Sequence, residues 1–322
     1  MEWFAIVVGV FVALLLLSYL IEALRRQPTP PTELHWAPGV PIEYVEVNGI
    51  RLRYVVTGQG PTLVLLHTLR TQLDLFRKVI GELSKDFQVY AFDLPGHGYS
   101  DIPEEEYTPE FFAASVRGFL ETLEISDAII VGESIGGALG LLLAAEHNPR
   151  VRKVIAINSY DYGRGRSRYD YGRGRGITRG SLFSKLIFAL TNIPVVGGMV
   201  WRMRWYGAFA TIIKGSVHDD ASLPQGLVRE MHEVGNRRNH CRAFMSLVAH
   251  FPKWEKLRSV YGSIEIPVLM VYGEHDWSYT PKRESNRDAI PGAVLESVPG
   301  AGHLLSLDTP EATIRAAREF AG

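Results

Sequence analysis

The chain has 322 residues, of which 46% are hydrophobic, enough for one large α/β domain with a buried core and a smaller insertion. This composition excludes a chain that is disordered throughout. The 34 lysines and arginines nearly balance the 35 aspartates and glutamates, so the overall charge gives no case for nucleic acid as a partner. The single cysteine, Cys241, excludes an internal disulfide and cysteine-based zinc clusters.

The first predicted element is an apolar helix at residues 3–21, where only Ser18 and Tyr19 are polar. At about 1.5 Å per residue, a helix of this length approaches the hydrocarbon thickness of a bilayer. No basic segment precedes the run and no small-x-small site follows it, which favours an uncleaved anchor over a secretory signal. We therefore predict a single-pass transmembrane helix within residues 1–26.

The flanks of this helix predict its orientation and its connection to the rest of the chain. Glu2 precedes the apolar run, whereas Arg25 and Arg26 follow it, and basic residues tend to remain on the cytoplasmic side. The catalytic part of the chain is therefore expected in the cytoplasm. Residues 27–41 contain five prolines and predict a stiff, extended linker that holds the folded domain off the membrane.

From residue 42 onward, short β-like runs alternate with helical patterns, which predicts βαβ units and a mostly parallel sheet. The runs at 44–47 and 52–56 are separated by Asn48 and Gly49, a dipeptide typical of a two-residue hairpin, so the sheet should open with an antiparallel pair. Six further strands are expected at residues 62–66, 89–92, 128–131, 154–157, 268–271 and 294–298. Helices are expected near residues 73–83, 110–123, 135–147, 282–289 and 310–320.

Between the strands at 154–157 and 268–271 the alternation stops for about a hundred residues, too many for a simple loop. This predicts an inserted helical cap at residues 160–263, which divides the α/β core into residues 42–159 and 264–322. A repeat rich in Tyr, Arg and Gly occupies 160–166 and recurs at 169–175. Such tracts can bind single-stranded RNA, but this one is brief and lies inside a folded insertion, so a basic cap hinge is favoured.

The cap also carries a concentration of positive charge. Residues 160–215 contain ten basic residues against two acidic ones, in a chain that is otherwise nearly neutral. Near an anionic membrane surface each such charge contributes on the order of 1 kcal/mol. We expect this segment to bind anionic lipid, and a solvated basic face without a partner is the alternative.

The segment GESIG at residues 132–136 follows a predicted strand and leads into a predicted helix. In a G-x-S-x-G turn the glycines are needed because the nucleophile's backbone is strained and other backbone passes close by. Ser134 is then exposed at the helix N-terminus, where developing negative charge is favoured and the N–H of Ile135 can serve as an oxyanion donor. Ser134 is the predicted nucleophile.

A serine hydroxyl needs a base that a third group holds in one tautomer. Among ten histidines, His303 is preferred because it follows the last predicted strand, at the carboxyl edge of the sheet where loops converge. Asp276 follows the strand at 268–271 and is preferred as the orienting acid. Glu274 and Asp161 remain rival acids at the same edge.

The chain order Ser134, Asp276, His303 resembles that of the α/β hydrolases. The segment FDLPGHGYSD at residues 92–101 resembles the turn that this family carries after its fourth strand. The resemblance covers residues 42–158 and 264–320. It implies an eight-stranded, mostly parallel sheet flanked by helices, a cap over the active site, a structural role for His97, and no required cofactor or metal.

In one place the chain departs from that family. Where relatives usually have His-Gly after the third strand, this chain has His67 and Thr68, and threonine cannot adopt glycine's full conformational range. The N–H of Leu69 is the expected second oxyanion donor. Arg70 is expected beside the site, where it would favour a substrate carboxylate or phosphate, and a surface arginine paired with a carboxylate is the alternative. Glu133 is a second expected substrate contact.

The leading hypothesis is a serine hydrolase, similar to carboxylesterases and lipases, that cleaves a carboxylic ester or thioester of a lipophilic acyl substrate. Epoxide hydrolases and dehalogenases resemble this chain in cap and turn, but their nucleophile is an aspartate where this chain has Ser134. A cofactor-free C–C bond hydrolase or haloperoxidase-type enzyme and a non-catalytic ligand receptor remain alternatives on the same fold. The expected partners are a small acyl substrate and membrane lipid, with no nucleic acid and no obligate protein partner.

Overall fold

The computed structural model describes residues 1–161, 190, 193, 195–278 and 280–321. Eight strands form one sheet in the order β1-β2-β4-β3-β5-β6-β7-β8. Only the β1–β2 and β2–β4 pairs are antiparallel, which confirms the predicted, mostly parallel sheet. The strands are β1 (Glu43–Val47), β2 (Ile50–Thr57), β3 (Thr62–Leu66), β4 (Gln88–Phe92), β5 (Ala128–Glu133), β6 (Val151–Ile157), β7 (Val268–Gly273) and β8 (Val294–Val298).

The sheet opens with the predicted hairpin. Asn48 and Gly49 both have positive φ, +52° and +76°, as a type I′ turn requires of its two central residues. Val47 therefore pairs directly with Ile50, and β1 continues beside β2 in an antiparallel register.

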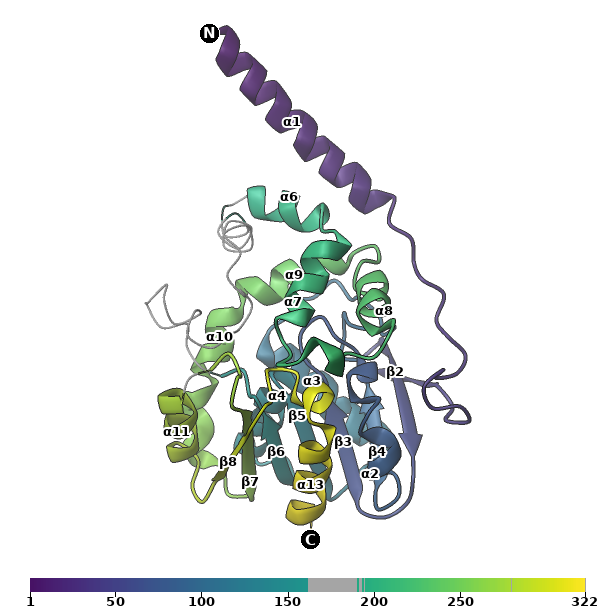
Figure 1. The fold of residues 1–322 in the computed structure, drawn as a ribbon, viewed down its shortest axis with the longest axis vertical. Helices are drawn as coiled ribbons and strands as arrows, with labels where there is room; N and C mark the ends of the chain where they lie inside the picture. Colours follow the sequence, from purple (N-terminus) through teal and green to yellow (C-terminus); the bar gives the residue numbers. More distant parts are fainter. Residues whose placement is uncertain (162–189, 191–192, 194, 279, 322) are drawn as a thin grey trace.

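Helices cover both faces of the sheet (Figure 1). Leu63 and Leu65 of β3 belong to one buried apolar cluster, whereas Val64 and Leu66 belong to the other, because successive side chains of a strand point to opposite faces. The flanking helices are α2 (Ile80–Leu83), α3 (Pro109–Thr122), α4 (Ile135–Ala145), α11 (Thr280–Asp288), α12 (Leu305–Asp308) and α13 (Pro310–Ala321). The long runs of apolar residues in the strands reflect this two-sided burial.

The predicted helix at 73–83 is instead two short pieces, a 3-10 turn η1 (Leu73–Phe76) and α2. The Leu73 N–H donates to a carboxylate oxygen of Asp93 at 2.8 Å, and an ion pair at 2.6 Å holds Asp74 against Arg53. These tertiary contacts fix the first turn separately from α2.

The cap lies over the carboxyl end of the sheet, next to α1 (Figure 1). Its described elements are α6 (Val196–Arg202), α7 (Tyr206–Lys214), η3 (Asp220–Ser222), α8 (Leu227–Val234), α9 (His240–Ala249), α10 (Phe251–Lys256) and η4 (Leu257–Ser263). The second copy of the Tyr/Arg/Gly repeat, most of the first copy and seven of the ten basic residues in 160–215 lie outside the described residues. The lipid-binding expectation for that segment therefore stays a prediction.

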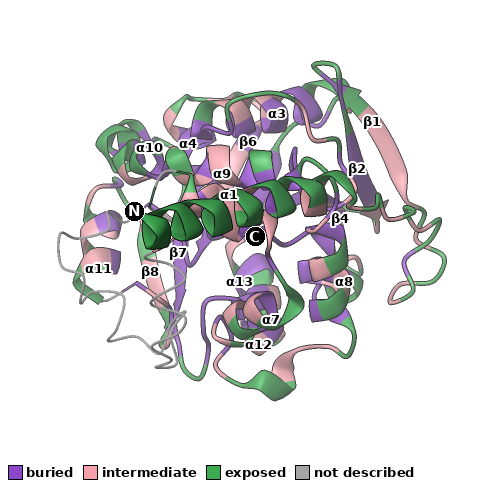
Figure 2. Ribbon diagram, turned by 90° about the horizontal axis from the view of Figure 1, so that it is seen from above, coloured by how far each residue is buried: buried purple, intermediate pink, exposed green. Residues whose placement is uncertain are grey.

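Helix α1 (Glu2–Ala23) is exposed along most of its length (Figure 2) and is long and apolar enough to cross a membrane, a test that a secretory signal also passes. Its carboxyl-terminal end contacts the cap. The Arg202 Nε donates to Ser18 Oγ at 3.0 Å, and Arg204 forms an ion pair with Glu22 at 2.8 Å. Ser18 is fully buried in this contact, unlike the rest of the helix.

The proline-rich segment 27–41, predicted as a stiff, extended linker, packs partly on the folded domain. Leu34 is buried in the apolar cluster that also contains α13 residues, and Trp36 Nε1 donates to Asp74 at 2.6 Å. Removing the side chain of Leu34 and the indole of Trp36 from water lowers the free energy, so the segment packs on the core. The segment and the contact between α1 and α6 together hold the apolar helix beside the cap.

Candidate active site

Ser134 lies at the sharp turn between β5 and α4. Its backbone has φ +58° and ψ −115°, a conformation that is costly for a residue with a side chain. The flanking glycines are required, because a Cβ at Gly136 would overlap the Leu66 carbonyl and one at Gly132 would overlap the Gly136 carbonyl. The Ser134 N–H donates to the Ile157 carbonyl at 2.8 Å, which secures the strained turn against the end of β6.

Ser134, His303 and Asp276 form one continuous line of hydrogen bonds. His303 Nε2 is 3.0 Å from Ser134 Oγ, and His303 Nδ1 is 2.5 Å from Asp276 Oδ1. The carboxylate accepts from Nδ1–H, so Nε2 is free to accept the serine proton. All three side chains are buried beneath the cap. This is the arrangement in which a serine hydroxyl can act as a nucleophile.

Neither rival acid contacts His303. Glu274 is mostly exposed and lies 3.7 Å from His275, while Asp161 accepts from Tyr261 at 2.7 Å and from Ser159 at 2.8 Å. Burial raises the pKa of Asp161 to about 6, despite those hydrogen bonds. The preference for Asp276 over these two carboxylates agrees with the geometry.

Two residues that the sequence reasoning missed hold Asp276 in place. Ser278 donates to Asp276 Oδ2 through its N–H at 2.9 Å and also through its hydroxyl, and Arg283 Nε donates to Ser278 Oγ at 3.1 Å. Burial alone would raise the pKa of Asp276, but His303, Ser278 and Arg283 together lower it below its ordinary value. Asp276 therefore stays a carboxylate that can stabilise imidazolium. A serine two positions after an aspartate is a signal for this kind of turn.

Trp277 is a third residue that sequence reasoning missed. Its ring stacks on the imidazole of His303, with centroids 3.8 Å apart and planes inclined by 9°. Trp277 Nε1 also approaches the carbonyl of Gly215 at 3.5 Å, at the end of α7. The indole therefore restrains the plane of the base and links it to the cap.

The two expected oxyanion donors are the backbone N–H groups of Ile135 and Leu69. Ile135 is the first residue of α4, where a helical N–H has no acceptor within the helix. Among the described residues, none accepts a hydrogen bond from the Leu69 N–H. Thr68 does not occupy the positive-φ region, and Thr71 Oγ1 accepts from its N–H at 3.2 Å and donates to its carbonyl at 2.8 Å. The loop therefore tolerates threonine where relatives usually have glycine.

The histidines of the flanking loops have structural roles. His67 Nε2 accepts from the Leu94 N–H at 3.0 Å and its Nδ1–H donates to the Thr68 carbonyl at 2.8 Å, which ties the loop after β3 to the turn after β4. His97 lies 3.0 Å from the Pro95 carbonyl, and burial lowers its pKa to about 3. These surroundings agree with the structural role expected for His97.

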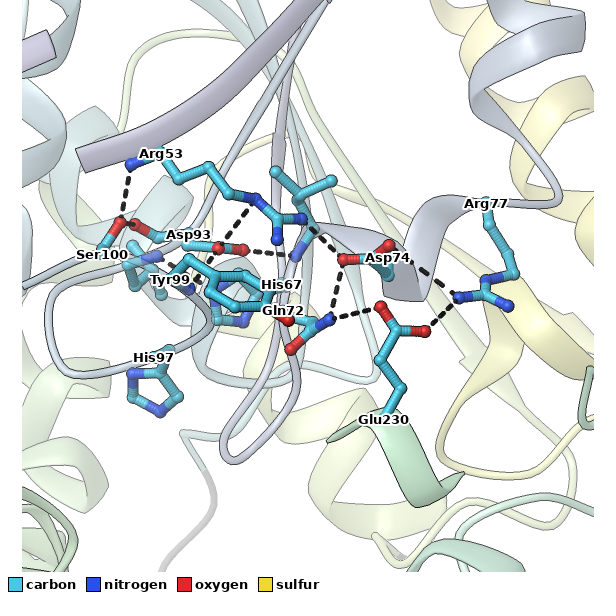
Figure 3. A network of polar contacts seen from close by, with 12 residues as sticks. Arg53, His67, Gln72, Asp74, Arg77, Asp93, His97, Tyr99, Ser100 and Glu230 are labelled. Atoms are coloured by element: carbon cyan, nitrogen blue, oxygen red, sulfur yellow. Dashed lines mark hydrogen bonds and ion pairs between the residues drawn. The ribbon is translucent and has the colours of Figure 1, made fainter. Parts of the chain in front are cut away.

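A buried charge network supports the loop after β3 (Figure 3). Arg53 of β2 forms ion pairs with Asp74 at 2.6 Å and with Asp93 at 3.2 Å, and all three side chains are almost fully buried. Arg77 continues the network to Glu230 of α8 at 3.0 Å. The loop after β3, the turn after β4 and the cap are therefore joined through charged side chains.

Arg70 and Glu133, the two expected substrate contacts, have different surroundings. The Arg70 side chain extends from the loop after β3 to cap helices α6, α7 and α9, with its guanidinium over the rings of Trp201, Phe209 and Phe244. It is buried, and no carboxylate in the described part of the chain pairs with it as the alternative interpretation required.

Glu133 instead faces the core. Its carboxyl is fully buried near Leu305 and Ser306 of α12, and this burial raises its pKa to about 8. The structure does not support substrate contact for Glu133, because its side chain leaves β5 on the side of α12.

Comparisons with known proteins identify the fold. A family model for the alpha/beta hydrolase fold matches residues 61–183. An uncharacterized protein of Mycobacterium tuberculosis is 24% identical over 309 residues, which cover 92% of this chain and 82% of that protein. A 2-(acetamidomethylene)succinate hydrolase of Mesorhizobium japonicum is 25% identical over 283 residues (86% and 93%), and epoxide hydrolase 3 of Xenopus tropicalis is 25% identical over 350 residues (97% and 90%).

Solved structures show the same fold. The wild-type Cfl2 structure from Burkholderia cenocepacia has a TM-score of 0.75 and 20% identity, and the match covers 91% of this chain and 99% of that chain. The structure of a membrane phospholipase A, described as a bacterial virulence factor, has a TM-score of 0.70 and 21% identity, with coverage of 100% and 98%.

Proposed function

The chain has the α/β-hydrolase fold, and from that premise we propose that it is a membrane-anchored serine hydrolase that cleaves a carboxylic ester or thioester of a lipophilic acyl substrate. The observation that carries the proposal is the hydrogen-bonded line from Ser134 Oγ through His303 to Asp276. A binding protein has no need for a serine in a strained turn that is also paired with an oriented base.

In the proposed reaction, Ser134 Oγ attacks the acyl carbon while His303 Nε2 takes the hydroxyl proton. The N–H groups of Ile135 and Leu69 stabilise the oxyanion that develops on the carbonyl oxygen. His303 then donates its proton to the leaving alcohol or thiol, and an acyl-enzyme remains. Water, deprotonated by the same imidazole, attacks that ester and releases the acid and the free serine.

Serine as nucleophile favours acyl transfer over epoxide opening. Attack of Ser134 Oγ on an epoxide carbon would leave an ether, which water does not cleave under these conditions, whereas attack on an acyl carbon leaves an ester that the triad can hydrolyse. The likeness to an epoxide hydrolase is therefore a likeness of fold.

The lipophilic substrate and the membrane location are supported by α1 and the cap. Loss of α1 by signal cleavage would remove the Ser18–Arg202 hydrogen bond and the Glu22–Arg204 ion pair, so we propose that the helix is retained as an anchor with the domain on the cytoplasmic side. The similar fold of a membrane phospholipase A supports a lipid-derived acyl substrate, and membrane lipid is the proposed partner.

A fluorophosphonate probe tests the proposal. The full-length chain in detergent should be labelled at Ser134, and Ser134→Ala should lose labelling and about 10⁴-fold or more of kcat on a short-chain ester. Circular dichroism and elution volume should match those of wild type. Equal labelling of the two proteins would remove Ser134 as the nucleophile.

A further inference from the structure

Arg70 is a buried cation without a counter-ion. Its side chain is only 8% exposed, and its Nε and Nη2 have no hydrogen-bond partner. Among the described residues, no carboxylate forms an ion pair with it. A buried charge is normally paired because desolvation is costly. An unpaired guanidinium beneath the cap therefore points to an anion that the described residues do not supply.

Aromatic rings surround the Arg70 guanidinium but do not accept hydrogen bonds from its in-plane N–H donors. Its Cζ lies 5.4 Å from the ring centroid of Trp201, 4.8 Å from that of Phe209 and 5.1 Å from that of Phe244. Ring faces attract positive charge, but they do not replace oxygen acceptors for the N–H donors in the guanidinium plane. The rings hold the cation in position and exclude water, which strengthens its attraction for an anion.

The charge around Arg70 is positive. Arg204 and Arg25 lie close enough to lower its pKa further, after burial itself, to about 9, so Arg70 is still protonated at neutral pH. Glu22 is already paired with both of those arginines. The other titratable groups that interact with Arg70 are uncharged at neutral pH. Burial raises the pKa of the Cys241 thiol and lowers the pKa of three imidazoles, those of His97, His232 and His240.

The backbone of Arg70 belongs to the loop that carries the proposed oxyanion donor. Arg70 follows Leu69, the proposed oxyanion donor, and its own φ of +58° turns the loop after β3 at this position. We propose that Arg70 binds a carboxylate carried by the ester substrate, so that the enzyme prefers esters with a free carboxylate on the acyl or the alcohol part. This inference rests on the proposed function. The planar fork of a guanidinium matches the two oxygens of a carboxylate.

Two matched pairs of esters test the preference on the full-length chain in detergent. Mono-p-nitrophenyl adipate and p-nitrophenyl hexanoate share a six-carbon acyl chain and a leaving group, and differ in one terminal carboxylate. 4-(Hexanoyloxy)benzoate and phenyl hexanoate place the same difference on the alcohol part. Wild type should prefer the anionic member of at least one pair, and Arg70→Gln should lower kcat/KM for that ester by about 10- to 100-fold while changing the neutral ester less than about threefold.

Two further variants separate a bound carboxylate from a general effect. Arg70→Lys keeps the charge and should retain part of the preference. Arg242→Gln removes a cap cation that is 43% exposed and already paired with Glu104, and should leave the preference within about threefold of wild type. Equal losses for both members of a pair in Arg70→Gln would make Arg70 a positioning residue of the oxyanion loop and overturn the proposal. No preference in wild type, or the same loss in Arg242→Gln, would also overturn it.

A binding measurement keeps this inference distinct from the proposed function. Monobutyl adipate should quench or shift the tryptophan fluorescence of Ser134→Ala, with Trp201 beside the site, and dibutyl adipate should bind more weakly. The double variant Ser134→Ala, Arg70→Gln should lose the difference. If wild type hydrolysed no ester, this binding difference would still support the carboxylate site while the esterase proposal failed. Equal binding of the two adipates would contradict the carboxylate site alone.

Discussion

Asp276 acts on Ser134 only through the tautomer of His303. Its Oδ1 accepts from Nδ1–H at 2.5 Å, and Ser278 donates twice to the other oxygen, so the carboxylate cannot rotate without breaking three hydrogen bonds. Glu274, two residues away in sequence, is turned toward His275 and solvent. Distance along the chain therefore says little about which acid faces the base.

This difference predicts a ranking of two variants. Asp276→Asn should lower kcat on a short-chain ester by about 10³- to 10⁴-fold, because an amide can donate to Nδ1 and favour the wrong tautomer. Glu274→Gln should change kcat less than about twofold. Steady-state kinetics of the two purified full-length proteins checks this, and the reverse ranking would assign the orienting role to Glu274.

Glu133 predicts a pH dependence of stability that is separate from catalysis. Burial raises its pKa from an ordinary 4.5 to about 8, so between these values the folded protein holds a proton that the unfolded chain releases. Its contribution to stability therefore falls as pH rises from about 4.5 to 8. Glu133→Gln removes this dependence. Relative to wild type, its thermal midpoint should be about 2–6 °C higher at pH 8.5 and no higher at pH 5.

Thermal unfolding of wild type and variant at the two pH values measures the effect. Glu274→Gln serves as the control, because that carboxylate is exposed and should show no such pH difference. An identical pH response of wild type and Glu133→Gln would mean that Glu133 is ionised in the folded protein.

At the scale of elements, the loop after β3 depends on Arg53. This arginine of β2 neutralises Asp74 in η1 and Asp93 after β4, both of which are buried. Removing one member of a buried ion pair leaves an uncompensated charge, and that costs more than the pair itself contributes. Here two carboxylates would remain.

Arg53→Met should therefore lower the free energy of unfolding by about 3–5 kcal/mol. Arg51→Met is the matched control on the same strand, since Arg51 is exposed and lies over the ring of Tyr44, and its cost should stay below about 1 kcal/mol. Thermal unfolding of both variants makes the comparison. A loss in Arg53→Met no larger than that in Arg51→Met would show that the network does not support the fold.

The strands were predictable because burial on both faces of the sheet dictates their apolar runs. The nucleophile was predictable because local backbone contacts require the glycines around Ser134. The base and acid were predictable from strand ends. What could not be predicted depends on contacts between distant segments: Asp74 and Asp93 break the expected helix at 73–83, and Arg53 of β2 pairs with both. Such pairs leave no periodic pattern in a single sequence.

For the whole molecule, the apolar helix and the cap form one unit. Ser18, Glu22 and Arg25 at the end of α1 contact Arg202 and Arg204 around α6, and Trp201 of α6 is one of the rings over Arg70. The Arg204 side chain also donates to the Trp201 carbonyl at 2.9 Å. A displacement of α1 would therefore shift α6, the cap helix whose Trp201 lies over Arg70.

This coupling predicts that one end of α1 matters for lipophilic substrates. Glu22→Gln leaves Arg204 without its ion pair, which should loosen α6 and lower hydrolysis of a long-chain ester presented in vesicles by about 3- to 10-fold. The charge of Glu2, at the other end of the helix, is exposed, so Glu2→Gln is the matched control. Both variants should hydrolyse a short soluble ester at the wild-type rate, because Ser134, His303 and Asp276 are unchanged. Equal rates for Glu22→Gln and Glu2→Gln on the long-chain ester, with both proteins reconstituted at equal density, would show that the anchor holds the enzyme at the membrane without acting on the cap.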